Sequence, residues 1–101
     1  MNNTVRINAE EQKYWNSDSA DYWVSQKPAL DRLLAPWARL LLEAAELSGG
    51  EQIADIGCGT GATTLKFAAS VGTGGRIIGI DLSRKLIDSA IKSARERAIE
   101  N

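Results

Sequence analysis

The sequence predicts an α/β protein in which N-terminal helices precede a β-α-β-α segment of parallel sheet. Residues 52–56 are a short apolar run that leads into a glycine-rich turn. Residues 76–81 are a second apolar run, which ends in an acidic residue, and a helix-like segment follows each run. Strands that alternate with helical segments are typical of parallel pairing, because parallel strands need a crossover connection.

The first half of the chain has the pattern of several helices. Asn8 is expected to cap a short helix, and a second short helix is expected around residues 20–24. Pro28 and Pro36 are each expected to begin a new helix, since proline suits a first helical turn and breaks a helix interior. The glycines at 49–50 are expected to end the last of these helices and turn the chain into the first strand.

The second half is expected to form strands over 52–56 and 76–81, with a helix over 62–71 between them. Ser83 is expected to cap a final helix, because its hydroxyl can accept a hydrogen bond from a free N–H group of the first turn. Both strands are too apolar to alternate, which predicts a sheet covered on both faces.

Composition predicts one soluble, cytoplasmic domain of 101 residues, with a helical region at 1–48 and a partial ligand-binding unit at 49–101. Twelve basic and thirteen acidic residues give a net charge of −1, which provides no electrostatic basis for binding nucleic acid or an anionic membrane. The single cysteine, Cys58, cannot form an internal disulfide, as expected in a reducing compartment. No apolar run approaches the length of a membrane span, and no metal site is predicted.

Two features carry chemistry, the glycine-rich turn and Asp81. Glycine at positions 57, 59 and 61 lets the backbone bend sharply and approach a ligand closely. Asp81 ends the second strand, so a parallel pairing places it beside that turn, at the carboxyl edge where such sheets bind ligands. A carboxylate at this edge can accept both hydroxyl protons of a ribose, which predicts a nucleoside-containing ligand.

Two ligands fit this pattern. Gly57, Gly59 and Ala62 satisfy the G-x-G-x-x-G/A fingerprint of dinucleotide binding, with Asp81 near the expected distance, so an NAD(P)-dependent oxidoreductase is one interpretation. Asp55 argues against it, because a carboxylate beside a pyrophosphate would repel it. S-adenosylmethionine carries an ammonium and a sulfonium, so an acid in front of the turn favours the methyl donor.

The residues Asp55-Ile56-Gly57-Cys58-Gly59-Thr60-Gly61 resemble motif I of the class I S-adenosylmethionine-dependent methyltransferases, and 79–83 resemble the end of their second strand. The similarity is greatest to the ubiquinone/menaquinone C-methylase-like small-molecule branch, and it includes the lead-in Tyr14-Trp15-Asn16. The resemblance implies a Rossmann-like sheet, S-adenosylmethionine as methyl donor and a small-molecule acceptor. It implies these cofactor-binding residues: Asp55, Gly57, Cys58, Gly59, Thr60, Gly61, Asp81 and Leu82.

In that family Asp55, Gly57 and Gly59 would line the methionyl pocket, Asp81 would hold the ribose, and Leu82 would pack on the adenine. The family has further strands beyond its second helix, so the chain is expected to be truncated and no catalytic residue can be assigned. Two strands alone make a marginal sheet, and self-association that completes the sheet is therefore expected.

Several interpretations remain open at this stage. Cys58 is a small residue tolerated beside the cofactor rather than a nucleophile, because the chain has no histidine to act as its base. Asp81 is also suited to prepare the Ser83 cap. Tyr14, Trp15 and Trp23 suit either helix packing or a lid over the cofactor. A non-catalytic helical interaction module is the remaining alternative.

Overall fold

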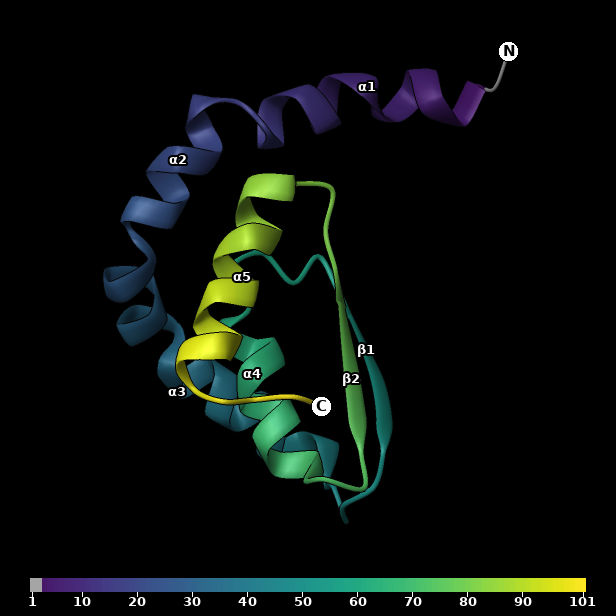
Figure 1. Ribbon diagram of the computed structural model, residues 1–101, viewed down its shortest axis with the longest axis vertical. Helices are drawn as coiled ribbons and strands as arrows, with labels where there is room; N and C mark the ends of the chain where they lie inside the picture. The colour runs from purple at the N-terminus through teal and green to yellow at the C-terminus, as the bar shows by residue number, and fades with distance from the viewer. Residues whose placement is uncertain (1–2) are drawn as a thin grey trace.

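The computed structural model describes the backbone of residues 3–101 and the side chains from residue 7 onward. The elements, in order, are α1 (Asn3–Trp15), α2 (Asp18–Ser25), α3 (Lys27–Ala45), β1 (Gln52–Ile56), α4 (Ala62–Val71), β2 (Arg76–Ile80) and α5 (Arg84–Glu96). Figure 1 shows α4 and α5 on one face of the sheet, with the helices α1 to α3 forming an arc around them. The predicted order of N-terminal helices followed by β-α-β-α is confirmed.

The two strands pair in parallel, and their register brings the two candidate chemical features together. Gln52 pairs with Arg76 at one end and Ile56 with Ile80 at the other. Because both strands run in the same direction, the glycine turn after β1 and Asp81 after β2 leave the sheet at the same edge. The bounds predicted for the first strand and for the helix that follows it agree with the structure.

The apolar core lies between the sheet and the two helices that cover it. The buried apolar side chains of this layer are Leu65, Phe67, Ala68, Val71 and Leu86. Four of the five come from α4, so this crossover helix supplies most of the contact with the strands. Among the described residues, none of the helices combines the length and the hydropathy that a membrane-spanning segment requires.

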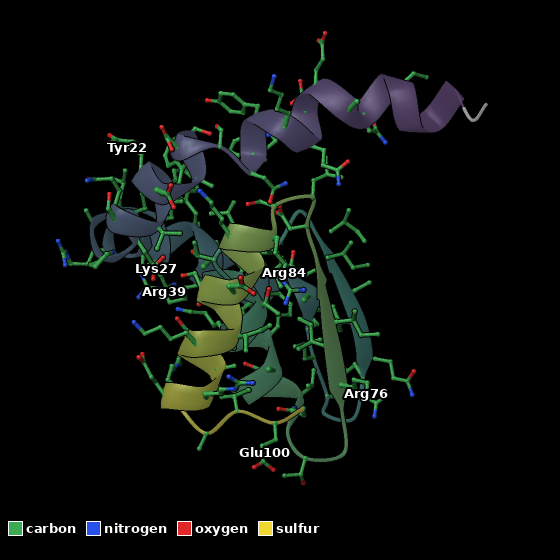
Figure 2. All side chains as sticks on the ribbon, turned by 45° about the horizontal axis from the view of Figure 1, so that its top comes forward. Tyr22, Lys27, Arg39, Arg76, Arg84 and Glu100 are labelled. Carbon is green, nitrogen blue, oxygen red and sulfur yellow. The ribbon has the colours of Figure 1, made fainter. Side chains whose placement is uncertain are left out.

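The sheet is covered on one face only, and the expectation of two covered faces is wrong for the described residues. Exposure alternates along both strands, and Ile56, Ile78 and Ile80 are 73%, 54% and 48% exposed on the open face. Figure 2 shows Arg76 of this face pointing away from the helices. The crossover helix α4 and the following helix α5 share the other face, where residues of both line one cavity with Ile77 and Gly79 of β2.

The first helix begins earlier than its cap signal indicated. Asn8 lies inside α1, which starts at Asn3, so the predicted cap at Asn8 is wrong. Asparagine disfavours a helix interior by only a fraction of a kcal/mol, about 0.7 at most, and this weak preference does not stop the helix. A capping residue in the sequence therefore marks a permitted helix start rather than an obligatory one.

Pro36 also lies inside a helix, and the predicted new helix at this position is wrong. α3 runs without interruption from Lys27 to Ala45, with Pro28 in its first turn. Pro36 has no N–H group for the carbonyl of Arg32, but both residues are exposed, so water can satisfy that oxygen. The helix ends at Glu46, which has a φ of 49°, before the glycine pair is reached.

Ser83 caps α5 as predicted, and replacing it tests the energetic value of this cap. Its hydroxyl accepts a hydrogen bond from the N–H of Leu86 at 3.1 Å, and the residue is 0% exposed. Ser83→Ala should lower the free energy of unfolding by about 1 kcal/mol, as measured by urea denaturation. Ser70→Ala is the control, because the exposed Ser70 hydroxyl bonds only the carbonyl of Lys66 in its own helix. The cap would have no such value if both variants stayed within about 0.5 kcal/mol of the parent.

Candidate functional site

The glycine-rich turn is fastened to the end of β2 by backbone hydrogen bonds. The N–H groups of Gly57 and Cys58 both donate to the carbonyl oxygen of Ile80, at 2.7 Å and 3.0 Å. A further bond from Gly61 N–H to the Cys58 carbonyl, at 3.0 Å, closes the turn. The turn is therefore an extension of the strand pairing, and its position relative to β2 is set by the sheet.

Gly57 and Gly59 give the turn a backbone shape and an open surface that other residues would remove. Their φ angles are 76° and 57°, in the left-handed region that favours glycine. No heavy atom outside the adjoining residues lies within 4 Å of the position that a Cβ atom would take at either glycine. The space above the turn is therefore open, and a ligand can approach the backbone there.

Asp81 connects this turn to the start of α5. Its Oδ2 accepts a hydrogen bond from Gly59 N–H at 2.9 Å, and its Oδ1 accepts one from Ser83 N–H at 2.8 Å. The predicted position beside the turn is confirmed, and so is the alternative role of preparing the Ser83 cap. An ionised carboxylate has about four acceptor sites, so both oxygens retain capacity for a ligand hydroxyl.

Asp55 lies beneath the turn, on the covered face of β1. Its Oδ2 accepts a hydrogen bond of 2.6 Å from the Thr64 hydroxyl, in the first turn of α4. Its partner across the sheet is Gly79. The second acid of the site is thus held at the junction of β1 and α4, where the N-terminal end of the helix favours negative charge.

Cys58 points into the protein rather than toward the open edge. It lines an apolar cavity of about 250 Å³ between β2, α4 and α5. Gly79 makes room for it, since a Cβ atom at Gly79 would lie 2.9 Å from the Cys58 Sγ. Burial raises the pKa of the Cys58 thiol, and the negative charges of Asp81 and Asp55 raise it further. Gly79 was not among the predicted site residues, although a glycine inside an apolar strand signals close approach.

Of the remaining predicted residues, one packs between helices and two lie at the rim of the site. Gly61 lies at a helix contact, because a Cβ atom there would come within 2.9 Å of the Ala90 Cβ. The Thr60 hydroxyl accepts a hydrogen bond of 3.5 Å from the Lys27 ammonium, which also pairs with Asp31 at 2.8 Å. The Leu82 side chain is 48% exposed at the edge of the sheet, where the planar ring of a bound ligand could pack against it.

A larger cavity lies away from the strand edge and does not coincide with the acids and the glycine turn. It has a volume of about 400 Å³ and separates α3 from α4 and α5. Neither this cavity nor the smaller one is lined by Gly57, Gly59 or Asp81. We place the candidate site at the strand edge despite the cavities, because backbone shape, open space and two carboxylates converge there.

The N-terminal aromatic residues form two edge-to-face pairs, each within one helix. The rings of Tyr14 and Trp15 are 5.0 Å apart, and those of Tyr22 and Trp23 are 5.5 Å apart. Tyr14 and Tyr22 are 52% and 57% exposed. These contacts favour local packing of the aromatic side chains, and the lid interpretation stays a prediction.

A family model described as a methyltransferase domain matches residues 47–101, which is more than half of the chain and includes both acids and the glycine turn. The chain belongs to this family, the class I S-adenosylmethionine-dependent methyltransferase domains. The resemblance inferred from the motif at 55–61 is confirmed.

Two relatives agree with the methyltransferase assignment. The chain is 41% identical over 66 residues to aklanonic acid methyltransferase DauC of Streptomyces sp. (strain C5), covering 65% of this chain and 30% of that protein. It is 32% identical over 99 residues to a demethylmenaquinone methyltransferase of Lactococcus lactis, covering 96% of this chain and 39% of that protein.

The chain is also similar to the crystal structure of a SAM-dependent methyltransferase from Aquifex aeolicus, with a TM-score of 0.58 and 22% identity over 63% of this chain and 34% of that one. This similarity supports the fold. The methyltransferase domain described here spans 30% and 39% of the two curated relatives, so it corresponds to only part of their length.

The raised pKa of Cys58 predicts slow alkylation of the folded methyltransferase domain. Only the thiolate reacts, so iodoacetamide should modify Cys58 more slowly in the folded chain than in urea, with the midpoint of the pH–rate curve displaced upward. The folded state keeps this proton more tightly. The resulting contribution to stability is fully present below the pKa of the unfolded thiol, and it is lost as the pH rises from that value through the higher pKa of the folded thiol.

Charge-removing variants separate the causes of this pKa shift. Asp81→Asn should lower the midpoint partly, because burial, the larger cause, remains. Asp88→Asn is the matched control, since Asp88 pairs with Arg84 on the exposed side of α5. A thiol that reacts equally fast in folded and unfolded protein would contradict the burial of Cys58.

Proposed function

We propose that this chain carries the donor-binding turn of an enzyme that transfers a methyl group from S-adenosylmethionine to a small molecule. The observation that supports it best is the Asp81 carboxylate, which is bonded to Gly59 N–H beside an open glycine turn. Membership of the family implies S-adenosylmethionine as the donor, and the positions of these residues indicate where the groups of the donor would bind.

The described residues fit the parts of S-adenosylmethionine. Asp81 would accept the ribose hydroxyls, and the half-exposed Leu82 would pack against the adenine. Asp55 would face the ammonium of the methionyl group. A pyrophosphate at the same place would meet that negative charge, so the charge pattern favours the methyl donor over NAD(P).

The carboxylate of the donor would bind at the start of α4 rather than at the amides of the turn itself. The N–H groups of Gly57, Cys58 and Gly59 already donate to Ile80 or Asp81. The first N–H groups of a helix have no partner within it, so the N–H groups of residues 62–64 are the suitable donors. Cys58 would then contribute backbone shape only, because its side chain faces the inner cavity.

When bound, the donor supplies a methyl group already activated by the sulfonium, so the chemistry needs positioning and exclusion of water. The residues of this chain would hold the donor in position.

We further propose that residues 49–101 form the donor-binding unit and that residues 1–48 form a helical region packed on it. The start of the family match at residue 47 supports this division. A small-molecule acceptor is supported by the names of the relatives, which specify aklanonic acid and demethylmenaquinone as their own substrates.

Removal of the Asp81 carboxylate should weaken donor binding. Asp81→Asn keeps the size of the side chain and should lower the affinity for S-adenosylhomocysteine at least tenfold in isothermal titration, because hydrogen bonds to a charged group are lost. Asp88→Asn is the control, since Asp88 lies on the exposed side of α5 and pairs with Arg84. Equal affinities of Asp81→Asn and the parent would remove Asp81 from the site, and preferential binding of NAD would overturn the assignment of the ligand.

We also propose that the chain associates with a second copy of itself, which completes the sheet. Ile56, Ile78 and Ile80 form an exposed apolar surface on a sheet of two strands. Ile78→Lys should shift the protein toward monomer in sedimentation velocity experiments, because burying the introduced charge is costly. Ile7→Lys is the matched control, as Ile7 is 74% exposed on α1. A parent protein that stays monomeric at high concentration would contradict the proposal.

A further inference from the structure

Asn16 connects the N-terminal helices to the loop that carries Asp81 and Leu82. It lies at the junction of α1 and α2, and its side-chain amide bonds both sides of that loop. The amide nitrogen donates to the Leu82 carbonyl at 3.0 Å, and the amide oxygen accepts from Arg84 N–H at 2.7 Å. These partners are 66 and 68 residues away in the sequence.

The amide is itself held in place from α1. Its nitrogen also donates to the carbonyl of Gln12 at 2.7 Å, so both N–H bonds and one oxygen lone pair are used. The amide donates to two carbonyls and accepts from Arg84 N–H at once, which a hydroxyl cannot do because it has a single hydrogen to donate. Aspartate would keep the acceptor and lose the donor, and alanine would lose both.

We infer that Asn16 is a positioning residue that holds the Asp81–Arg84 loop in the geometry needed for the adenosine half of the donor. This inference rests on the proposed function. The loop is bonded at Leu82 and Arg84 by Asn16, and between them the Ser83 N–H bonds Asp81 Oδ1. Asp81 Oδ2 then accepts from Gly59, so a continuous chain of hydrogen bonds runs from α1 to the glycine turn.

Other contacts dock the same helices without touching this loop, which allows docking and positioning to be separated. Ala20 of α2 is 0% exposed, and α2 packs against α5. Asp21 pairs with Lys85 at 2.8 Å, with 61% and 41% of the two side chains exposed. Such an exposed pair contributes little to stability, so its removal leaves the loop bonds intact.

The test compares Asn16→Ala and Asn16→Asp with Asp21→Ala as the matched control at the same helix interface. In isothermal titration, Asn16→Ala should lower the affinity for S-adenosylhomocysteine about tenfold, and Asp21→Ala should lower it less than twofold. In Asn16→Ala the Arg84 amide should exchange its hydrogen faster, and the amide resonance of Gly59 should move, although Asn16 does not contact Gly59. Asn16→Asp should leave the slow hydrogen exchange of the Arg84 amide unchanged. It should still lower the affinity for S-adenosylhomocysteine, because the Leu82 carbonyl loses its donor.

The amide measurements need no ligand, so they distinguish failure of this inference from failure of the proposed function. If the parent protein bound no S-adenosylhomocysteine, the proposed function and the positioning role based on it would both fall. If the parent bound and Asn16→Ala bound equally well, with Gly59 unmoved, only the inference would be overturned. A Gly59 shift of equal size in Asp21→Ala would assign the effect to helix docking, and that result would also overturn it. Asn16→Asp keeps the test decisive if the alanine variant does not fold.

Discussion

The geometry of the strand edge depends on the two hydrogen bonds accepted by the Asp81 carboxylate. One comes from Gly59 in the turn after β1 and the other from Ser83 at the start of α5. Charge-assisted bonds of this kind are stronger than bonds between neutral groups. Because the same carboxylate has further acceptor sites, its structural role and its proposed ribose contact are compatible. The ligand would bind a group that the fold has already oriented.

Small residues allow close packing between the helices and the sheet beside this edge. Gly61 lets α4 approach Ala90 of α5, and Gly79 leaves space for the Cys58 side chain between the strand and the helices. This packing also explains why Cys58 is unsuited to nucleophilic chemistry. Cys58 is partly buried, which raises the thiol pKa, and its side chain lines the inner cavity rather than the open edge.

Local signals were sufficient for much of the second half of the chain. The helix over 62–71 and the cap at Ser83 lie where predicted, because such signals act on the backbone next to them. In the N-terminal half the signals at Asn8 and Pro36 were misleading. Their preferences are small or are satisfied by water at exposed positions, so neither residue interrupts its helix.

The sequence by itself determined the chemistry of the site, namely an acid before a glycine turn and a second acid after the next strand. These residues follow local patterns, and parallel pairing necessarily brings the ends of neighbouring strands to one edge. Only the tertiary structure decided which face of the sheet is covered, where Cys58 points, and that Asn16 bonds the Asp81 loop. Contacts between segments more than sixty residues apart depend on how the helices dock, and no local pattern encodes that arrangement.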